Sequence, residues 1–175
     1  MKKIIIITVI LSVFLISKKF SDEIIIPKDA IRFRVIANSN KDIDQNIKKN
    51  VASSLNKELT NILGQSENID ESRNKIINNY DAIENNIVTT LKNNNIDESF
   101  NISYGMNYFP KKEYKGITYE EGNYESLVVT LGEGLGDNWW CVLFPPLCLL
   151  EAEENKTDEV EYKLFINKIL DKFSK

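Results

Sequence analysis

The sequence predicts an α+β protein in which a small, mainly antiparallel sheet is covered on one face by helices. Three segments, Ile31–Ile36, Phe100–Tyr108 and Tyr124–Leu131, alternate apolar with polar residues at the period of two that a half-buried strand requires. Two long segments between the first and the second of these, and one at the C-terminus, instead carry apolar residues at helical spacing. The resulting order is β-α-α-β-β-α, which suits one sheet with its helices on one side.

Length, charge and the lack of histidine limit the possible functions. The chain has 175 residues, which predicts one domain. Its net charge is −4, and the four Lys of residues 1–20 leave −8 for residues 21–175. Such a domain repels phosphate backbones, so we expect no nucleic-acid partner. Without His there are no Ser-His or Cys-His catalytic pairs and no His-based metal sites, and we expect no cofactor.

Residues 1–20 are typical of an export signal. Lys2 and Lys3 precede an apolar run, Ile4–Ile16, whose 13 residues span about 20 Å as a helix, less than the roughly 30 Å of a hydrocarbon core. That length suits a signal peptide. The following Ser17-Lys18-Lys19 offers no small-x-small cleavage pattern, so a cleaved signal peptide and an uncleaved membrane anchor both stay open. In either case we expect residues 21–175 to form a single exported domain.

The first strand and helix follow from local signals. A short apolar run, Ile24–Ile26, precedes the strand Ile31–Ile36. Residues 37–40, Ala-Asn-Ser-Asn, then provide a turn and a helix N-cap. The next segment, Asp42–Leu63, carries an apolar residue at every fourth position and ends before Gly64.

Two further helices are predicted by apolar stripes. Residues Ile69–Lys92 place six apolar side chains within a narrow sector of a helical wheel, which predicts one continuous helix closed by the Asn run at 93–95. The C-terminal segment Asp158–Phe173 shows a similar stripe.

The remaining strands lie between these helices. Phe100–Tyr108 has one apolar and one polar face, so we expect it to be antiparallel and solvated on one side. Tyr114–Tyr119 is a candidate short strand, and Gly122-Asn123 forms a turn before Tyr124–Leu131. We expect Phe100–Tyr108 and Tyr124–Leu131 to pair and to pack their apolar faces on the helices.

An uncharged segment, residues 138–150 (NWWCVLFPPLCLL), contains every Trp and Cys of the chain. We expect a loop there, since a glycine-rich stretch precedes it and the acidic run Glu151–Glu161 follows. Its aromatic side chains suit burial, docking of a partner, or insertion into lipid. For docking, we expect one of Trp139 and Trp140 to anchor the loop and the other to be substantially exposed with Phe144 or Leu147.

Cys141 and Cys148 are predicted to form a disulfide, because an exported chain meets an oxidising environment and the intervening prolines turn the chain back. Closing so short a loop would contribute about 2–3 kcal/mol in the chain-entropy model. Two buried free thiols are the alternative. The spacing is not the C-x-x-C of a redox site, and two thiolates without His are too few for a zinc site.

The glycine-rich stretch Gly132–Gly136 (GEGLG) superficially resembles a phosphate-binding loop. It lacks the following Lys-Ser/Thr and the glycine spacing of a dinucleotide fingerprint, and its neighbouring carboxylates would repel phosphate. A flexible connection is the better interpretation.

Two blocks of sequence resemble stage II sporulation protein R of endospore-forming bacteria. The first is Ile31–Gln45, IRFRVIANSNKDIDQ. The second, from Tyr104 to Cys148, includes Gly122-Asn123-Tyr124-Glu125 and GEGLGDNWWCVLFPPLC. Arg34 departs from the pattern, since many members of that family are expected to have His there.

The resemblance implies a signalling role. Proteins of this family are made in the forespore, exported into the space between the two sporulation membranes, and trigger a membrane-embedded aspartic protease that cleaves the precursor of the mother-cell sigma factor. It supplies no catalytic residues, so we expect a non-enzymatic protein near a membrane. The surfaces that we expect to meet the protease contain Trp139, Trp140, Phe144 and Leu147, and next Asn38, Ser39, Asp44 and Gln45. The alternatives are a cell-envelope hydrolase and a membrane-associated structural protein that inserts its Trp loop in lipid.

Overall fold

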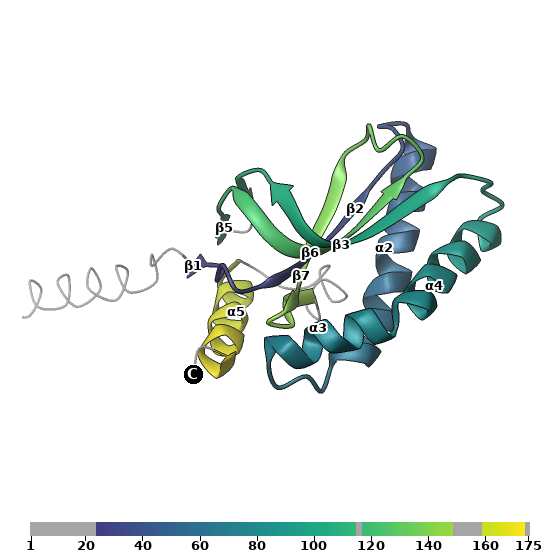
Figure 1. Cartoon of the computed structure of the whole chain (residues 1–175). Helices are drawn as coiled ribbons and strands as arrows, with labels where there is room; N and C mark the ends of the chain where they lie inside the picture. The colour runs from purple at the N-terminus through teal and green to yellow at the C-terminus, as the bar shows by residue number, and fades with distance from the viewer. Residues whose placement is uncertain (1–23, 115–116, 149–158, 174–175) are drawn as a thin grey trace, which may run out of the picture.

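A four-stranded sheet forms the centre of the computed structural model (Figure 1). Its strands lie in the order β3 (Phe100–Phe109), β6 (Gly122–Leu131), β2 (Ile31–Ile36) and β7 (Asn138–Phe144). β3 runs antiparallel to β6 and β7 antiparallel to β2, whereas β2 and β6 are parallel. The predicted α+β class is confirmed, and so is the antiparallel pairing of the two strands that were expected to be partners.

The structure describes residues 24–114, 117–148 and 159–173. The expected export signal in residues 1–20 lies outside these ranges, as does most of the acidic run that follows residue 150. Within them, no helix is both long enough and apolar enough to cross a membrane.

Three helices cover one face of this sheet (Figure 1). α2 spans Asp42–Leu63 as predicted, but the single helix expected over residues 69–92 is wrong, because it is divided into α3 (Ile69–Asn78) and α4 (Tyr80–Asn93). Asn79 interrupts it with φ −112° and ψ 18°, and its side-chain amide donates to the Lys75 carbonyl at 2.8 Å. A short amide side chain can compete in this way for the carbonyls of a helix, which the apolar periodicity does not register.

The main core lies between these helices and the sheet. Ile31, Phe33 and Val35 of β2 are fully buried there, because alternate residues of a strand point to the same face. Side chains at every other position of β6 and along the inner stripes of the helices complete it, including Leu127, Val129, Val51, Leu55, Ile83 and Ile87.

A second, smaller sheet covers part of the opposite face. It contains β1 (Ile24–Ile25), β5 (Ile117–Tyr119) and β4 (Lys112–Tyr114), in that order. The single short strand expected at 114–119 is therefore two antiparallel strands. The ring centre of Tyr119 lies 6.0 Å from the guanidinium carbon of Arg32 in β2, so the small sheet lies against the main one.

The C-terminal helix α5 (Glu159–Phe173) agrees with the predicted helix to within one residue. It buries Ile166 in a small second core that contains Ile26, Ala30, Val142 and Leu147. Its last residue, Phe173, packs edge-on against Phe144 of β7, with ring centres 5.0 Å apart.

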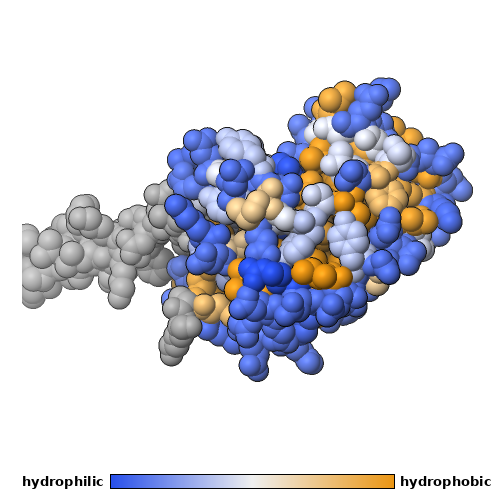
Figure 2. Space-filling view, viewed as in Figure 1, coloured by the Kyte–Doolittle hydropathy of each residue, from blue (hydrophilic) through white to orange (hydrophobic). Residues whose placement is uncertain are grey.

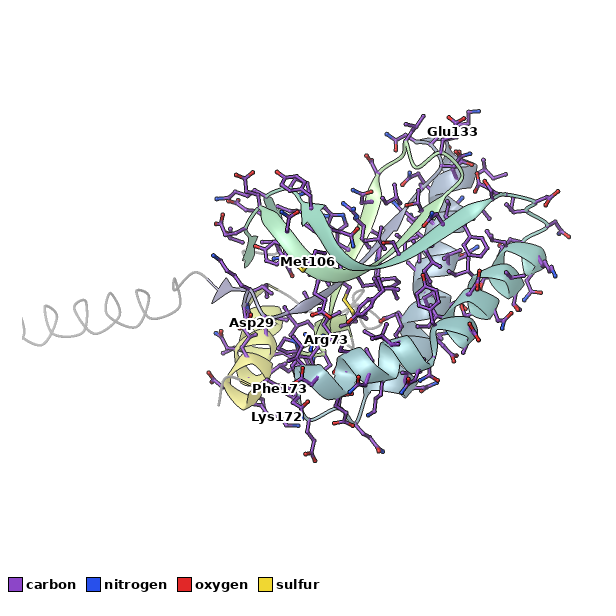
Figure 3. All side chains as sticks on the ribbon, in the orientation of Figure 1. Asp29, Arg73, Met106, Glu133, Lys172 and Phe173 are labelled. Carbon is purple, nitrogen blue, oxygen red and sulfur yellow. A yellow bond between two sulfur atoms is a disulfide. The ribbon has the colours of Figure 1, made fainter. Side chains whose placement is uncertain are left out.

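Arg73 joins α3 to the sheet through a bidentate ion pair (Figure 3). Its Nε and Nη2 donate to the two carboxylate oxygens of Glu125 at 2.8 and 2.7 Å, and the Tyr104 hydroxyl donates to the same carboxylate. The Arg73 guanidinium therefore lowers the pKa of Glu125, and burial together with Glu125 raises the pKa of Tyr104. The negative charge of Glu125 is therefore balanced by Arg73, and its carboxylate also accepts the hydrogen bond of Tyr104.

Candidate partner-binding site

Two loops meet at one end of the main sheet, where β2 leads into α2 and β6 leads into β7. We call them the 37–41 turn and the 132–137 loop. Backbone N–H groups of Leu135 and Gly136 donate to the carbonyls of Asn38 and Ala37, both at 2.9 Å. The side-chain oxygen of Asn38 accepts from the Glu133 N–H at 2.9 Å. Figure 3 shows Glu133 at the tip of its loop. The two segments are thus held together along their length.

The glycines of the 132–137 loop make this close approach possible. Gly132 and Gly134 have φ of +53° and +66°, a region that other residues seldom adopt. A Cβ at Gly136 would lie 2.4 Å from the Ser39 carbonyl oxygen, which no side chain tolerates. The expectation of a flexible connection is therefore wrong, because this stretch is a hydrogen-bonded loop with a defined shape.

The first turns of α2 hold the 37–41 turn in place through side-chain hydrogen bonds. The Gln45 amide donates to the Ser39 carbonyl at 2.9 Å and to the Asn40 side chain at 3.2 Å. The buried Lys48 ammonium donates to Gln45 Oε1 at 2.6 Å and to the Asp137 carbonyl at 3.1 Å. Lys48 therefore links both loops to the helix, and burial lowers its pKa.

A cleft of about 590 Å³ lies where these loops meet the segment before β3. Four carboxylates, Asp44, Asp97, Glu98 and Glu133, line it together with a single ammonium, Lys41. Burial raises the pKa of Glu98, and the nearby Asp44 raises it further. This negative lining favours a cationic group of a partner. In the part of the chain that is described, no three or more acidic or Cys side chains are placed to hold a metal ion.

Leu135 adds an apolar contact beside these charges. It also lines the cleft, and its side chain is 74% exposed. An exposed Leu held at a fixed position by its own backbone hydrogen bond is suited to contact with a second protein. The cleft therefore combines one apolar anchor with an acidic surface.

The structure brings together only half of the side chains that the sequence suggested for docking. Asn38, Ser39 and Asp44 line the cleft, and Gln45 supports it from α2. The remaining lining carboxylates and Leu135 were not predicted as site residues. The three glycines were the available signal, since they mark a loop packed against another backbone.

The aromatic segment expected as a loop is instead mostly strand β7, followed by a turn at Pro145 and Pro146. Trp139 and Trp140 consequently point to opposite faces of the sheet. Trp139 packs edge-on against Phe33 on the helix side, and Trp140 packs edge-on against Phe109 on the other side, each at 5.3 Å between ring centres.

The expected exposure of this segment is wrong. Both indoles are partly buried, so neither Trp has the substantial exposure that was expected of the one left free for a partner. Phe144 and Leu147 are buried, against α5 and in the second core respectively. The physical reason is that pairing with β2 places the side chains of β7 on one or the other of two covered faces.

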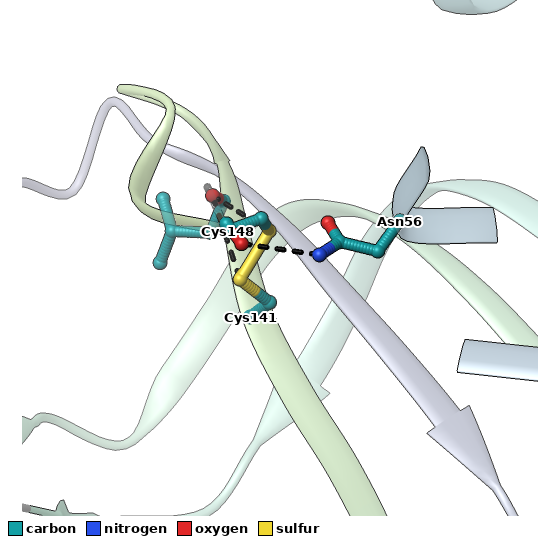
Figure 4. The surroundings of a disulfide bond; sticks show 4 residues. Asn56, Cys141 and Cys148 are labelled. Carbon is teal, nitrogen blue, oxygen red and sulfur yellow. Dashed lines mark hydrogen bonds between the residues drawn. A yellow bond between two sulfur atoms is a disulfide. The ribbon is translucent and has the colours of Figure 1, made fainter. Parts of the chain in front are cut away.

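The predicted disulfide between Cys141 and Cys148 is confirmed, with 5.5 Å between the two Cα atoms (Figure 4). The amide of Asn56 on α2 donates to the Cys148 carbonyl at 3.1 Å. The bridge closes the turn after β7, and the amide attaches that turn to the helix that also supports the cleft.

Comparison with known proteins identifies the family. The family model described as stage II sporulation protein R matches residues 27–154. Stage II sporulation protein R of Bacillus subtilis (strain 168) is 35% identical over 159 residues, which are 88% of this chain and 71% of that relative. No solved structure matches. The chain therefore belongs to the stage II sporulation protein R family.

Proposed function

We propose that this chain is an exported, non-enzymatic signal of endospore formation that triggers a membrane-embedded aspartic protease to process the precursor of the mother-cell sigma factor. The observation that supports this proposal is the convergence of the 37–41 turn and the 132–137 loop. Both belong to the segments that resemble the family. Together they form an acidic cleft with an exposed Leu and hold it rigidly.

The cleft can bind a partner without catalysing a reaction. Its carboxylates attract a Lys or Arg side chain from an extracytoplasmic loop of the protease, and Leu135 covers an apolar neighbour of that side chain. Because the lining is held by backbone hydrogen bonds, little order has to be gained on binding.

The test is processing of the sigma precursor in sporulating cells whose own copy of the protein has been removed. Full-length variants Leu135→Asp and Glu133→Lys should lower the cleaved fraction at least tenfold in an immunoblot while the melting temperature stays unchanged. The matched control is Leu164→Asp, because Leu164 is also an exposed apolar residue, at 55%, but lies on α5. Normal processing by both cleft variants, or equal loss in the control, would show that the protease does not bind at the cleft.

A cell-envelope hydrolase is the second candidate, and one observation favours it. Glu98 has a raised pKa in a cleft beside a second carboxylate, Asp44, as a general acid requires. Glu98→Gln separates the two functions, since it removes proton transfer and retains the shape of the cleft. We expect this variant to support processing of the sigma precursor, whereas a hydrolase would lose its activity.

Insertion of the aromatic segment into lipid is the remaining alternative. Among the described residues of this segment, Phe144 and Leu147 are buried, so neither presents an apolar tip to a bilayer. We therefore expect Trp139 and Trp140 to show no blue shift of fluorescence when liposomes are added to the protein.

A further inference from the structure

The face of the main sheet opposite the helices carries cationic and aromatic side chains centred on Phe109. The guanidinium carbons of Arg32 and Arg34 lie 5.3 and 4.7 Å from its ring centre, and the Trp140 ring packs on it edge-on. We call this group the Phe109 cluster; it consists of Arg32, Arg34, Phe109, Lys112, Tyr124 and Trp140. Arg34 and Trp140 are direct partners in the pairing of β2 with β7, which places their side chains next to each other.

The cluster contains buried donors without acceptors. Arg32 is 2% exposed and stacks at 3.4 Å on the Tyr124 ring, and apart from this contact with Tyr124 its three buried side-chain nitrogens find no hydrogen-bond acceptor among the described residues. Arg34 Nε and Trp140 Nε1 are likewise buried and unpaired within the same part of the chain. Guanidinium and indole N–H groups only donate, so an acceptor is what the cluster lacks.

The aromatic rings compensate for only part of the burial of these charges. A cation over an aromatic face is stabilised by less than the free-energy cost of burying an unpaired ion. The ion pairs found between described residues involve neither arginine, and Glu125, in the same strand as Tyr124, is bound by Arg73 on the helix side. An external anion would supply the missing acceptors.

We propose that the Phe109 cluster is a binding site for an acidic side chain of a polypeptide partner. A carboxylate matches the planar fork of Arg34 and leaves an oxygen for Trp140 Nε1. Lys112 lies beside this position, with Nζ 4.9 Å from the centre of the Trp140 ring. The buried Arg32 adds further positive charge to this site.

Two further observations select a polypeptide over a polyanion. Residues 21–175 carry −8, which repels nucleic acids and anionic membranes but allows one carboxylate to enter a locally cationic site. The molecular outline is hollowed between the lobe with β4 and β5 and the lobe with the 132–137 loop, and apolar side chains are visible there (Figure 2). Such a surface suits the apolar neighbours of an acidic residue in a peptide. The proposal does not depend on the protease and can fail or succeed independently of it.

The experiment follows the indole N–H resonances of the full-length protein, labelled with ¹⁵N-Trp, during titration with sodium acetate. The Trp140 resonance should shift and saturate, while the Trp139 resonance stays in place as an internal control. Acetamide and sodium chloride at matched concentrations should have no effect. An equal shift of both resonances, no shift at all, or the same shift with chloride would overturn the site.

Two variants test the role of the arginines. Arg34→Gln should weaken acetate binding at least tenfold, and Lys111→Gln should not, because Lys111 pairs with Glu120 on the surface. Arg32→Met should also weaken binding. Unchanged affinity in either Arg34→Gln or Arg32→Met would overturn the proposal.

The peptide N-acetyl-Leu-Glu-Leu-amide tests the class of ligand. It should bind more tightly than acetate, and its Gln counterpart should not bind. Tighter binding of inorganic phosphate than of this peptide would show that the ligand is not an acidic polypeptide.

Discussion

Strand β2 buries two very different faces. Towards the helices it presents Ile31, Phe33 and Val35, which are fully buried among other apolar side chains. Towards the small sheet it presents Arg32 and Arg34, of which Arg32 is almost as inaccessible but finds no hydrogen-bond acceptor in the described part of the chain. The degree of burial of a residue therefore does not by itself measure its contribution to the stability of the fold. The first face stabilises the fold, while the second keeps donors available at a cost in stability.

The largest difference between the faces should appear when one large apolar side chain is removed. Phe33→Ala should lower the free energy of unfolding by about 3–5 kcal/mol, because it leaves a cavity beneath Trp139 and the helices. Urea denaturation followed by circular dichroism measures this loss. A loss below about 1 kcal/mol would mean that the helix face is not the main source of stability.

The disulfide lies at the edge of the same face and should have the next largest effect. Replacing both Cys141 and Cys148 with Ser should cost about 2–3 kcal/mol, since the unfolded chain regains the entropy of the open loop. Wild-type protein unfolded in the presence of a reductant provides the control and should show the same loss. Equal stability of the oxidised and reduced proteins would contradict this expectation.

Glu125 provides a charged group that is partnered, in contrast to Arg32. Glu125→Gln should cost about 1.5–3 kcal/mol at neutral pH, because a charge-assisted pair with Arg73 is lost. Since Arg73 lowers the pKa of Glu125 in the folded state, its contribution is fully present above the unfolded pKa of about 4.3 and is lost as the pH falls through the lower folded value.

Denaturation curves of wild type and Glu125→Gln between pH 7 and pH 2 measure this contribution. The two stabilities should converge as the solution becomes more acidic. Curves that stay parallel through this range would show that the ion pair does not exist in solution.

The smallest effect is expected from Arg32→Met. A buried charge without an acceptor can be replaced by an apolar side chain of similar length at little cost, so we expect a change within about 1 kcal/mol or a gain in stability. Thermal unfolding of this variant beside Phe33→Ala compares the two faces directly. A loss as large as that of Phe33→Ala would show that Arg32 is a structural residue with an acceptor in solution.

The sequence predicted the elements whose signals are local. The boundaries of α2 and β2 follow from apolar periodicity and flanking turn residues, and the structure reproduces them. The break at Asn79 was not predicted, because one side-chain hydrogen bond leaves the stripe of apolar residues unchanged. β7 was missed because a continuous apolar run followed by two prolines has no strand periodicity.

Features that depend on distant parts of the chain were harder to predict. The alternation in β2 indicates a solvated polar face, yet a later segment, β4 and β5, covers Arg32. Likewise, the sequence suggested Asn38, Ser39 and Asp44 as site residues. Their acidic neighbour Glu133 joins them through the parallel pairing of β2 with β6, and Glu98 through the antiparallel pairing of β3 with β6.

The parallel pairing of β2 with β6 also determines how much of the chain must be present before the main sheet can form. β2 lies early in the described chain, but its two neighbours, β6 and β7, come after three helices and β3. If the chain is exported as proposed and its N-terminal part emerges first, β2 is released before either neighbour arrives, and such non-local pairing is slow. The cleft needs the 132–137 loop, so on an exported chain it could assemble only after that loop has been translocated. Under the proposed function, the cleft would therefore become available to the partner only after most of the domain has crossed the membrane.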